Sequence, residues 1–84
     1  SKFSKNIVKK FKYFEEGKKI IEQSIKNDPN NIEIVFLRYL NQINSPWFLN
    51  YNQNLSEDRD FLNKNLNFIS DPYFKNVIQK ILKN

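Results

Sequence analysis

Apolar residues recur at steps of three and four along most of the chain, the spacing that places side chains on one face of an α-helix. The pattern predicts helices from about Ser4 to Lys12, from Phe14 to Asn27 and from Ile32 to Ile43. Two further stripes follow Ser56 and Asp71-Pro72. We therefore expect an all-α fold of four or five short helices, stacked as antiparallel hairpins, because helices this short need a neighbour to be stable.

The ends of the predicted helices carry local signals. Asp28-Pro29 ends the second helix, because the residue before a proline is pushed out of the helical region. Asn31 and Ser56 are placed to cap the third and fourth helices. Asp71 is placed to cap the fifth, with Pro72 at its first position.

The second predicted helix has the only glycine of the chain on its apolar face. That face consists of Gly17, Ile20, Ile21, Ser24 and Ile25. Glycine inside a helix costs about 1 kcal/mol relative to alanine, so its position on the apolar face predicts that a neighbouring helix comes close there. The third predicted helix is apolar on more than one side, which is typical of the buried centre of a bundle.

Length and composition limit the range of functions. Eighty-four residues make one small helical domain, 1–84, with neither His nor Cys. The chain therefore lacks the usual general base near neutral pH, the commonest metal ligand and any disulfide. We expect no enzymatic activity and no cofactor. No apolar run approaches the ~20 residues that a membrane span needs.

Two side-chain clusters invite a functional interpretation. Glu57 and Asp58, with Asp60, are the only acidic cluster, and we interpret them as first-turn acids that complement the helix dipole. Trp47, Phe48 and Tyr51 form the densest aromatic cluster. We expect these aromatic residues to close one end of the bundle. A protein-recognition patch and a platform for single-stranded nucleic acid are the alternatives.

The net charge of +5 lies entirely in the first third of the chain. Residues 1–26 hold eight lysines against three glutamates, whereas basic and acidic residues balance in residues 27–84. The predicted basic patch comprises Lys2, Lys5, Lys9, Lys10, Lys12, Lys18 and Lys19. We interpret these lysines first as a solvated face that keeps the domain soluble. An acidic partner or nucleic acid is the functional alternative.

Residues 14–31 resemble the second helix of a tetratricopeptide repeat. The family pattern has an aromatic residue at the helix entry, then small, bulky and small positions, and a proline after the helix. Phe14, Gly17, Ile21, Ser24 and Pro29 stand at those positions. The resemblance implies stacked helical hairpins with a groove that binds another macromolecule.

The rest of that repeat departs from the pattern. The preceding helix has Ser1, Ser4, Lys5 and Val8 where the family has aromatic, Leu, Gly and Tyr positions, and the register after Asn31 is also lost. A broader resemblance is to small uncharacterised helical proteins of Bacteroidota-type bacteria. It lies in Gly17-Lys18-Lys19, Phe36-Leu37-Arg38, Pro46-Trp47-Phe48-Leu49 and neighbouring residues. That resemblance implies a C-terminal portion of a longer helical protein, exported to the periplasm.

Our main hypothesis is a non-enzymatic interaction or scaffold module that binds a peptide or a partner's helix in a groove. The predicted contact residues are Arg38, Tyr39, Trp47, Phe48 and Tyr51, chosen as polar-tipped or charged groups near the end of the third helix. The alternative is a basic inhibitor-like or nucleic-acid-binding protein acting through its lysine-rich first third. Any apolar surface left uncovered would favour a homodimer.

Overall fold

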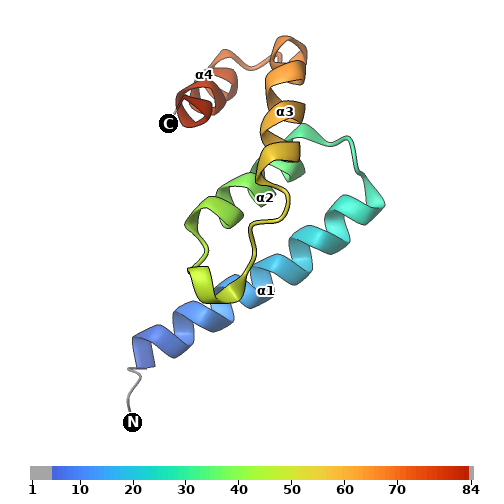
Figure 1. Ribbon diagram of the computed structural model, residues 1–84. Coiled ribbons are helices and arrows are strands. Elements are labelled where there is room, and N and C mark those ends of the chain that lie inside the picture. The colour runs from blue at the N-terminus through green and yellow to red at the C-terminus, as the bar shows by residue number, and fades with distance from the viewer. Residues whose placement is uncertain (1–4, 84) are drawn as a thin grey trace.

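The computed structural model describes residues 5–83, and these residues form helices and connecting segments without a strand (Figure 1). The elements are α1 (Lys5–Asn27), α2 (Ile32–Asn44), the 3₁₀ helix η1 (Trp47–Leu49), α3 (Leu55–Asn65), the 3₁₀ helix η2 (Leu66–Phe68) and α4 (Pro72–Leu82). The prediction of an all-α fold is confirmed.

The first two predicted helices are one continuous helix. α1 runs from Lys5 to Asn27 without a break, so the prediction of separate helices at Ser4–Lys12 and Phe14–Asn27 is wrong. The residues at the supposed break, Lys12–Phe14, include neither glycine nor proline, so nothing there interrupts the backbone hydrogen bonds. At 1.5 Å per residue the helix is about 35 Å long, and its first turns extend beyond the other helices (Figure 1).

The start signals of α2 and α4 act as predicted. Asn31 accepts a hydrogen bond of 3.2 Å from the Ile34 amide, and Asp71 accepts one of 2.9 Å from the Tyr73 amide. Ser56, in contrast, is not the cap of α3, which already begins at Leu55. Asn54 occupies the cap position without a side-chain cap bond, because its side-chain oxygen accepts a hydrogen bond from Gln42 instead.

The apolar core lies among α2, α3 and α4. Its buried members are Val35, Phe36, Tyr39, Leu62, Ile78 and Leu82. The rings of Phe36 and Phe74 meet edge to face with centroids 5.6 Å apart, which joins α2 to α4. Phe68 is exposed, because α3 ends at Asn65 and η2 turns the chain away.

α2 is the central helix, since it packs against α1 on one side and α3 on the other. α1 and α2 run in opposite directions as a helical hairpin, whereas α3 leaves that pair at a steep angle (Figure 1). The molecule measures 49 × 28 × 21 Å, and its radius of gyration of 14.3 Å exceeds the roughly 12 Å expected for a compact chain of this length. None of the helices in residues 5–83 is sufficiently long and apolar to cross a bilayer.

Candidate functional site

The candidate site is a groove between α1 and α2 that forms around Gly17. A Cβ atom placed on Gly17 would lie 2.9 Å from Nδ2 of Asn41 on α2, closer than side-chain carbons normally come to another atom. The prediction of a close helix–helix approach at Gly17 is therefore confirmed. Larger side chains on either side of Gly17 form the walls of the groove.

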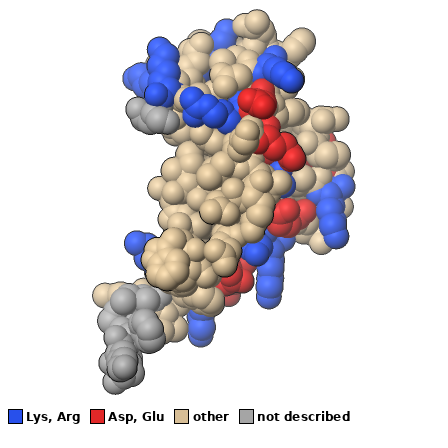
Figure 2. Space-filling view, viewed as in Figure 1, with Lys and Arg blue, Asp and Glu red and all other residues tan. Residues whose placement is uncertain are grey.

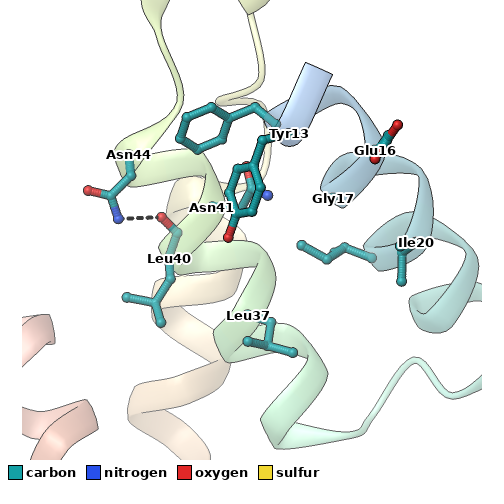
Figure 3. A pocket seen from close by; sticks show the side chains of 10 residues that line it. Tyr13, Glu16, Gly17, Ile20, Leu37, Leu40, Asn41 and Asn44 are labelled. Atoms are coloured by element: carbon teal, nitrogen blue, oxygen red, sulfur yellow. Dashed lines mark hydrogen bonds between the residues drawn. The ribbon is translucent and has the colours of Figure 1, made fainter. Parts of the chain in front are cut away.

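The groove is a hollow of about 580 Å³ with mostly apolar walls. On α1 it is lined by Tyr13 and Ile20, and on α2 by Leu37 and Leu40 (Figure 3). Tyr13 is 71% exposed, Ile20 67% and Leu37 53%, so none of the three is covered by another part of the described chain. Ile20 was predicted to face inward, and it lies at the rim because α2 packs closest to Gly17.

The charged side chains that line this surface are acidic. Among the described residues, Glu16 is the one charged residue that lines the groove, and it is exposed. On the other side of Leu37, between α2 and α4, a second hollow is lined by Glu33 and Asp71 together with apolar residues. Within the part of the chain that the structure describes, neither hollow has a lysine or an arginine among its lining residues. The two hollows together suit an apolar surface that carries basic side chains.

Trp47 and Phe48 lie on a different part of the surface, on η1. Trp47 is 86% exposed and Phe48 is half exposed, so the interpretation of this cluster as a plug of the bundle end is wrong for Trp47. The Phe48 ring stacks on Phe11 of α1 with centroids 6.0 Å apart and a 3° angle between the rings. Phe48 thus anchors the η1 segment to α1, while Trp47 packs edge-on against Phe48 and faces solvent.

The other three predicted contact residues are buried, which corrects their assignment as contacts. Arg38 on α2 donates from Nε and Nη2 to the two carboxylate oxygens of Asp58 on α3, each at 2.7 Å. Its Nη2 also reaches Glu57 at 3.1 Å, and its Nη1 reaches Glu22 of α1 at 3.5 Å. Arg38 and Asp58 are both nearly inaccessible to solvent. The guanidinium therefore ties three helices together and is not available to a partner.

Tyr51 completes this buried network. Its hydroxyl donates a hydrogen bond of 2.6 Å to Glu22, and its ring is buried beneath Lys18, whose Nζ lies 5.1 Å from the ring centroid. Burial, and then the hydrogen bond to the Glu22 carboxylate, raise the pKa of Tyr51 well above its usual value. The hydrogen bonds that Arg38 donates to the Asp58 carboxylate outweigh the opposing effect of burial and raise the pKa of Arg38. Both side chains therefore hold their protons in the folded protein.

Two further sets of polar contacts join α3 to its neighbours. Gln42 and Asn54 exchange two hydrogen bonds of 3.0 Å, one between their side chains and one from the Asn54 amide to the Gln42 side chain. Arg59 donates to the Tyr39 hydroxyl at 3.0 Å and to the carbonyl of Leu82 at the end of α4. Tyr39 is buried in the core, so it too is a structural residue.

The acidic cluster of α3 has a role that sequence reasoning missed. Glu57 and Asp58 do lie in the first turn of α3, as predicted, but Asp58 is buried and neutralises Arg38. The available signal was Arg38 itself, the only basic residue in a strongly apolar helix. A buried guanidinium needs a carboxylate, and Glu57 and Asp58 belong to the only acidic cluster. Among residues 5–83, no group of His, Cys, Asp or Glu is arranged to hold a metal ion.

The lysines of the predicted basic patch are dispersed. Lys9, Lys10, Lys12 and Lys19 of α1 are exposed, and Lys18 packs on Tyr51. Lys2 and the side chain of Lys5 lie outside the described part of the molecule. On the face shown in Figure 2, basic side chains stand singly along the lower half, and a broad uncharged surface lies between them and the upper end.

No known protein family, curated protein or solved structure matches the chain. The resemblances to a tetratricopeptide repeat and to Bacteroidota-type helical proteins remain predictions.

Proposed function

We propose that this protein is a non-enzymatic interaction module that binds an amphipathic helix of a protein partner in the groove between α1 and α2. The observation that carries the proposal is the exposure of Tyr13, Ile20 and Leu37 along one hollow of about 580 Å³. Contiguous apolar side chains on a soluble domain are typical of interaction sites. An apolar groove between two helices can bind a third helix, whose side chains at i, i+3, i+4 and i+7 would enter the groove.

Charge narrows the choice of partner. Because the groove and the hollow beside it are bordered by Glu16, Glu33 and Asp71, the bound helix is expected to carry lysine or arginine next to its apolar stripe. A helix with acidic flanks would meet like charges at the same border. Trp47 stays a candidate contact on a second surface, since it is accessible and is anchored by Phe48.

The polar network around Arg38 supports a structural assignment over a catalytic one. Arg38, Asp58, Glu22 and Tyr51 are hydrogen-bonded to one another, and the two pKa shifts hold Arg38 charged and Tyr51 neutral. Proton transfer in catalysis needs a group whose pKa lies near the working pH. These side chains instead fix the positions of α1, α2 and α3, on which the shape of the groove depends.

Binding of synthetic helices tests the proposal directly. Two fluorescent peptides of about 18 residues would share one apolar stripe and differ only in having lysine or glutamate on the polar face. We expect the lysine peptide to bind saturably and about tenfold more tightly, a difference of about 1.4 kcal/mol. Leu37→Arg should weaken that binding, whereas Phe68→Arg should not, since Phe68 is an equally apolar, exposed residue outside the groove. Equal binding of both peptides, unchanged by Leu37→Arg, would refute the proposal.

A second candidate function is supported by the charge of the first half of α1. Residues 5–14 contain four lysines and no acidic residue, and Lys9, Lys10 and Lys12 are exposed. This segment would attract nucleic acid or an acidic protein. Affinity for a single-stranded oligonucleotide that falls steeply with added salt supports this function, and binding that is absent or insensitive to salt contradicts it.

A further inference from the structure

We propose that the helix that occupies the groove is α1 of a second copy, so that two α1–α2 hairpins pair about a two-fold axis as an antiparallel four-helix bundle. This inference rests on the groove proposed above and names its occupant. It follows from four observations: a stripe on α1, the order of charges along that stripe, the accessible area of the chain, and the directions of α1 and α2.

The stripe on α1 has the spacing of a helix-pairing seam. Lys9, Tyr13, Glu16 and Ile20 follow one another at steps of four, three and four residues, which aligns them along one side of the helix. All four are exposed, and Tyr13, Glu16 and Ile20 line the groove. An alternation of three and four residues keeps a seam facing a second helix over several turns. α1 thus presents to solvent a seam that has the spacing of paired helices and carries two apolar and two charged side chains.

The order of charges along the seam fixes the direction of the second helix. Lys9 lies near the start of the seam and Glu16 lies two turns later. Antiparallel pairing of two α1 helices sets Lys9 of each copy toward Glu16 of the other, whereas parallel pairing sets lysine against lysine and glutamate against glutamate. The acidic border of the groove is matched in the same way, because the first half of α1 carries lysines and no acidic residue. The chain therefore complements itself in charge when the helices are antiparallel.

The chain exposes more surface than a compact monomer of the same mass, and the excess is enough for a dimer interface. The protein exposes 6459 Å², whereas a compact monomer of 10.2 kDa would expose roughly 5,300 Å². The difference of about 1,100 Å² is comparable to the ~800 Å² that each partner buries in a standard interface. Part of this surplus belongs to the first turns of α1, which extend beyond the other helices (Figure 1). Pairing along α1 would cover those turns and the rim residues Tyr13, Ile20 and Leu37 together.

The directions of α1 and α2 are compatible with an antiparallel pairing of two α1 helices. α1 and α2 already run antiparallel, so an α1 from a second copy that lies antiparallel to α1 runs parallel to α2 at the other wall of the groove (Figure 1). A two-fold axis between residues 12 and 13, midway between Lys9 and Glu16, gives each copy the same environment, which closes the assembly at two subunits. Two hairpins joined in this way form a four-helix bundle.

A charge-exchange experiment on the full chain tests the pairing. Wild type should have twice the chain mass by light scattering at about 100 μM and dissociate on dilution. Lys9→Glu and Glu16→Lys each set like charges together at both symmetric contacts, and each should weaken the dimer about tenfold. Their equimolar mixture restores two opposite-charge contacts, and it should dimerise more tightly than either variant alone. Ile20→Arg should abolish dimerisation, while Phe68→Arg should leave it intact.

The outcomes separate this inference from the proposed function. A wild type that stays monomeric at about 100 μM refutes the dimer, and the groove is then still supported if the lysine peptide binds and Leu37→Arg weakens it. A dimer that forms equally well with Ile20→Arg, or a mixture of the charge variants that is no tighter than its components, refutes this surface. Failure of the peptide to bind, with an intact dimer sensitive to Ile20→Arg, refutes only the proposal that the groove accepts a helix of another protein.

Discussion

The guanidinium of Arg38 on α2 and the carboxylate of Asp58 on α3 form a bidentate ion pair. Both hydrogen bonds are 2.7 Å long, and both side chains are buried. The pair lies between elements twenty residues apart in the chain and also draws in Glu22 from α1. It therefore decides how three helices are placed relative to one another. Removing one partner of a buried ion pair strongly destabilises a protein, whereas replacing both partners with apolar residues can leave its stability unchanged.

Removing Asp58 should lower the free energy of unfolding far more than removing Asp60, an exposed acidic residue on the same helix. Asp58→Ala leaves Arg38 buried with only the weaker contacts to Glu57 and Glu22, and we expect a loss of about 3–5 kcal/mol. A chain of this size has a net stability of roughly 4–13 kcal/mol, so much of the variant would unfold. Asp60→Ala, an exposed change on the same helix, should cost less than about 0.5 kcal/mol. Urea unfolding followed by circular dichroism at 222 nm measures both changes. Similar values for the two variants would contradict the structural role of the pair.

The limits of sequence reasoning are clearest at this pair. The sequence shows Arg38 in an apolar helix and Asp58 at the start of another helix, but it does not show that the two helices cross at these residues. First-turn acids have a sufficient local explanation in the helix dipole, so Asp58 was interpreted locally. Tyr51 was predicted to be a contact residue from its sequence neighbours Trp47 and Phe48, which is also a local argument. Its partner Glu22 is 29 residues away, and only tertiary packing brings the two together.

Sequence signals that act over a few residues, in contrast, gave correct predictions of local structure. Asn31 and Asp71-Pro72 start α2 and α4 as expected, because a cap acts on the next few backbone amides. Gly17 indicated a close approach of a neighbouring helix, because glycine has a cost inside a helix that a packing requirement can offset. The periodicity could not show how far round α1 the contact extends. Ile20 satisfies the same spacing as its neighbours and is nevertheless exposed.

Gly17 gives a prediction in which two effects compete. Gly17→Ala would gain about 1 kcal/mol of helix propensity, while its new methyl group would push Nδ2 of Asn41 from a position 2.9 Å away. That atom is the free end of a side chain and can rotate, so we expect a stability within about 1 kcal/mol of wild type. Rotation of the Asn41 side chain cannot make room for a leucine at position 17. Gly17→Leu must therefore separate α1 from α2 and should lower the free energy of unfolding by about 1–3 kcal/mol. Chemical unfolding of both variants tests the close approach, and a tolerated leucine would show that the helices are not tightly packed there.

Trp47 and Tyr51 are four residues apart and should respond oppositely to truncation. Trp47→Ala removes a side chain that is 86% exposed, so the free energy of unfolding should change by less than about 0.5 kcal/mol. Tyr51→Ala leaves a cavity and removes a hydrogen bond to Glu22, and we expect a loss of about 3–5 kcal/mol. Thermal unfolding monitored by circular dichroism distinguishes the two. A destabilising Trp47→Ala with a tolerated Tyr51→Ala would reverse the assignment of surface and core at this segment.

Tyr51 also predicts a specific pH dependence of stability. Its pKa is raised in the folded protein by burial and by the hydrogen bond to Glu22, whereas in the unfolded chain it titrates near 10. Below pH 10 both states hold the proton and the stabilisation is fully present. Above pH 10 the unfolded state loses the proton first, so stability falls by up to about 1.4 kcal/mol per pH unit from this residue until the folded hydroxyl also ionises.

Tyr51→Phe isolates that contribution from the titration of the lysines. Below pH 10 the variant should be about 1–2 kcal/mol less stable than wild type, because Glu22 loses its hydroxyl donor. Above pH 10 phenylalanine has no proton to release, so the curves of wild type and variant should converge and then cross. Urea unfolding at intervals from pH 8 to about pH 11 measures the difference, with Tyr73→Phe as the control because Tyr73 is exposed. A difference between wild type and Tyr51→Phe that stays constant through this range would contradict a raised pKa and show that the Tyr51 hydroxyl ionises as it would in water.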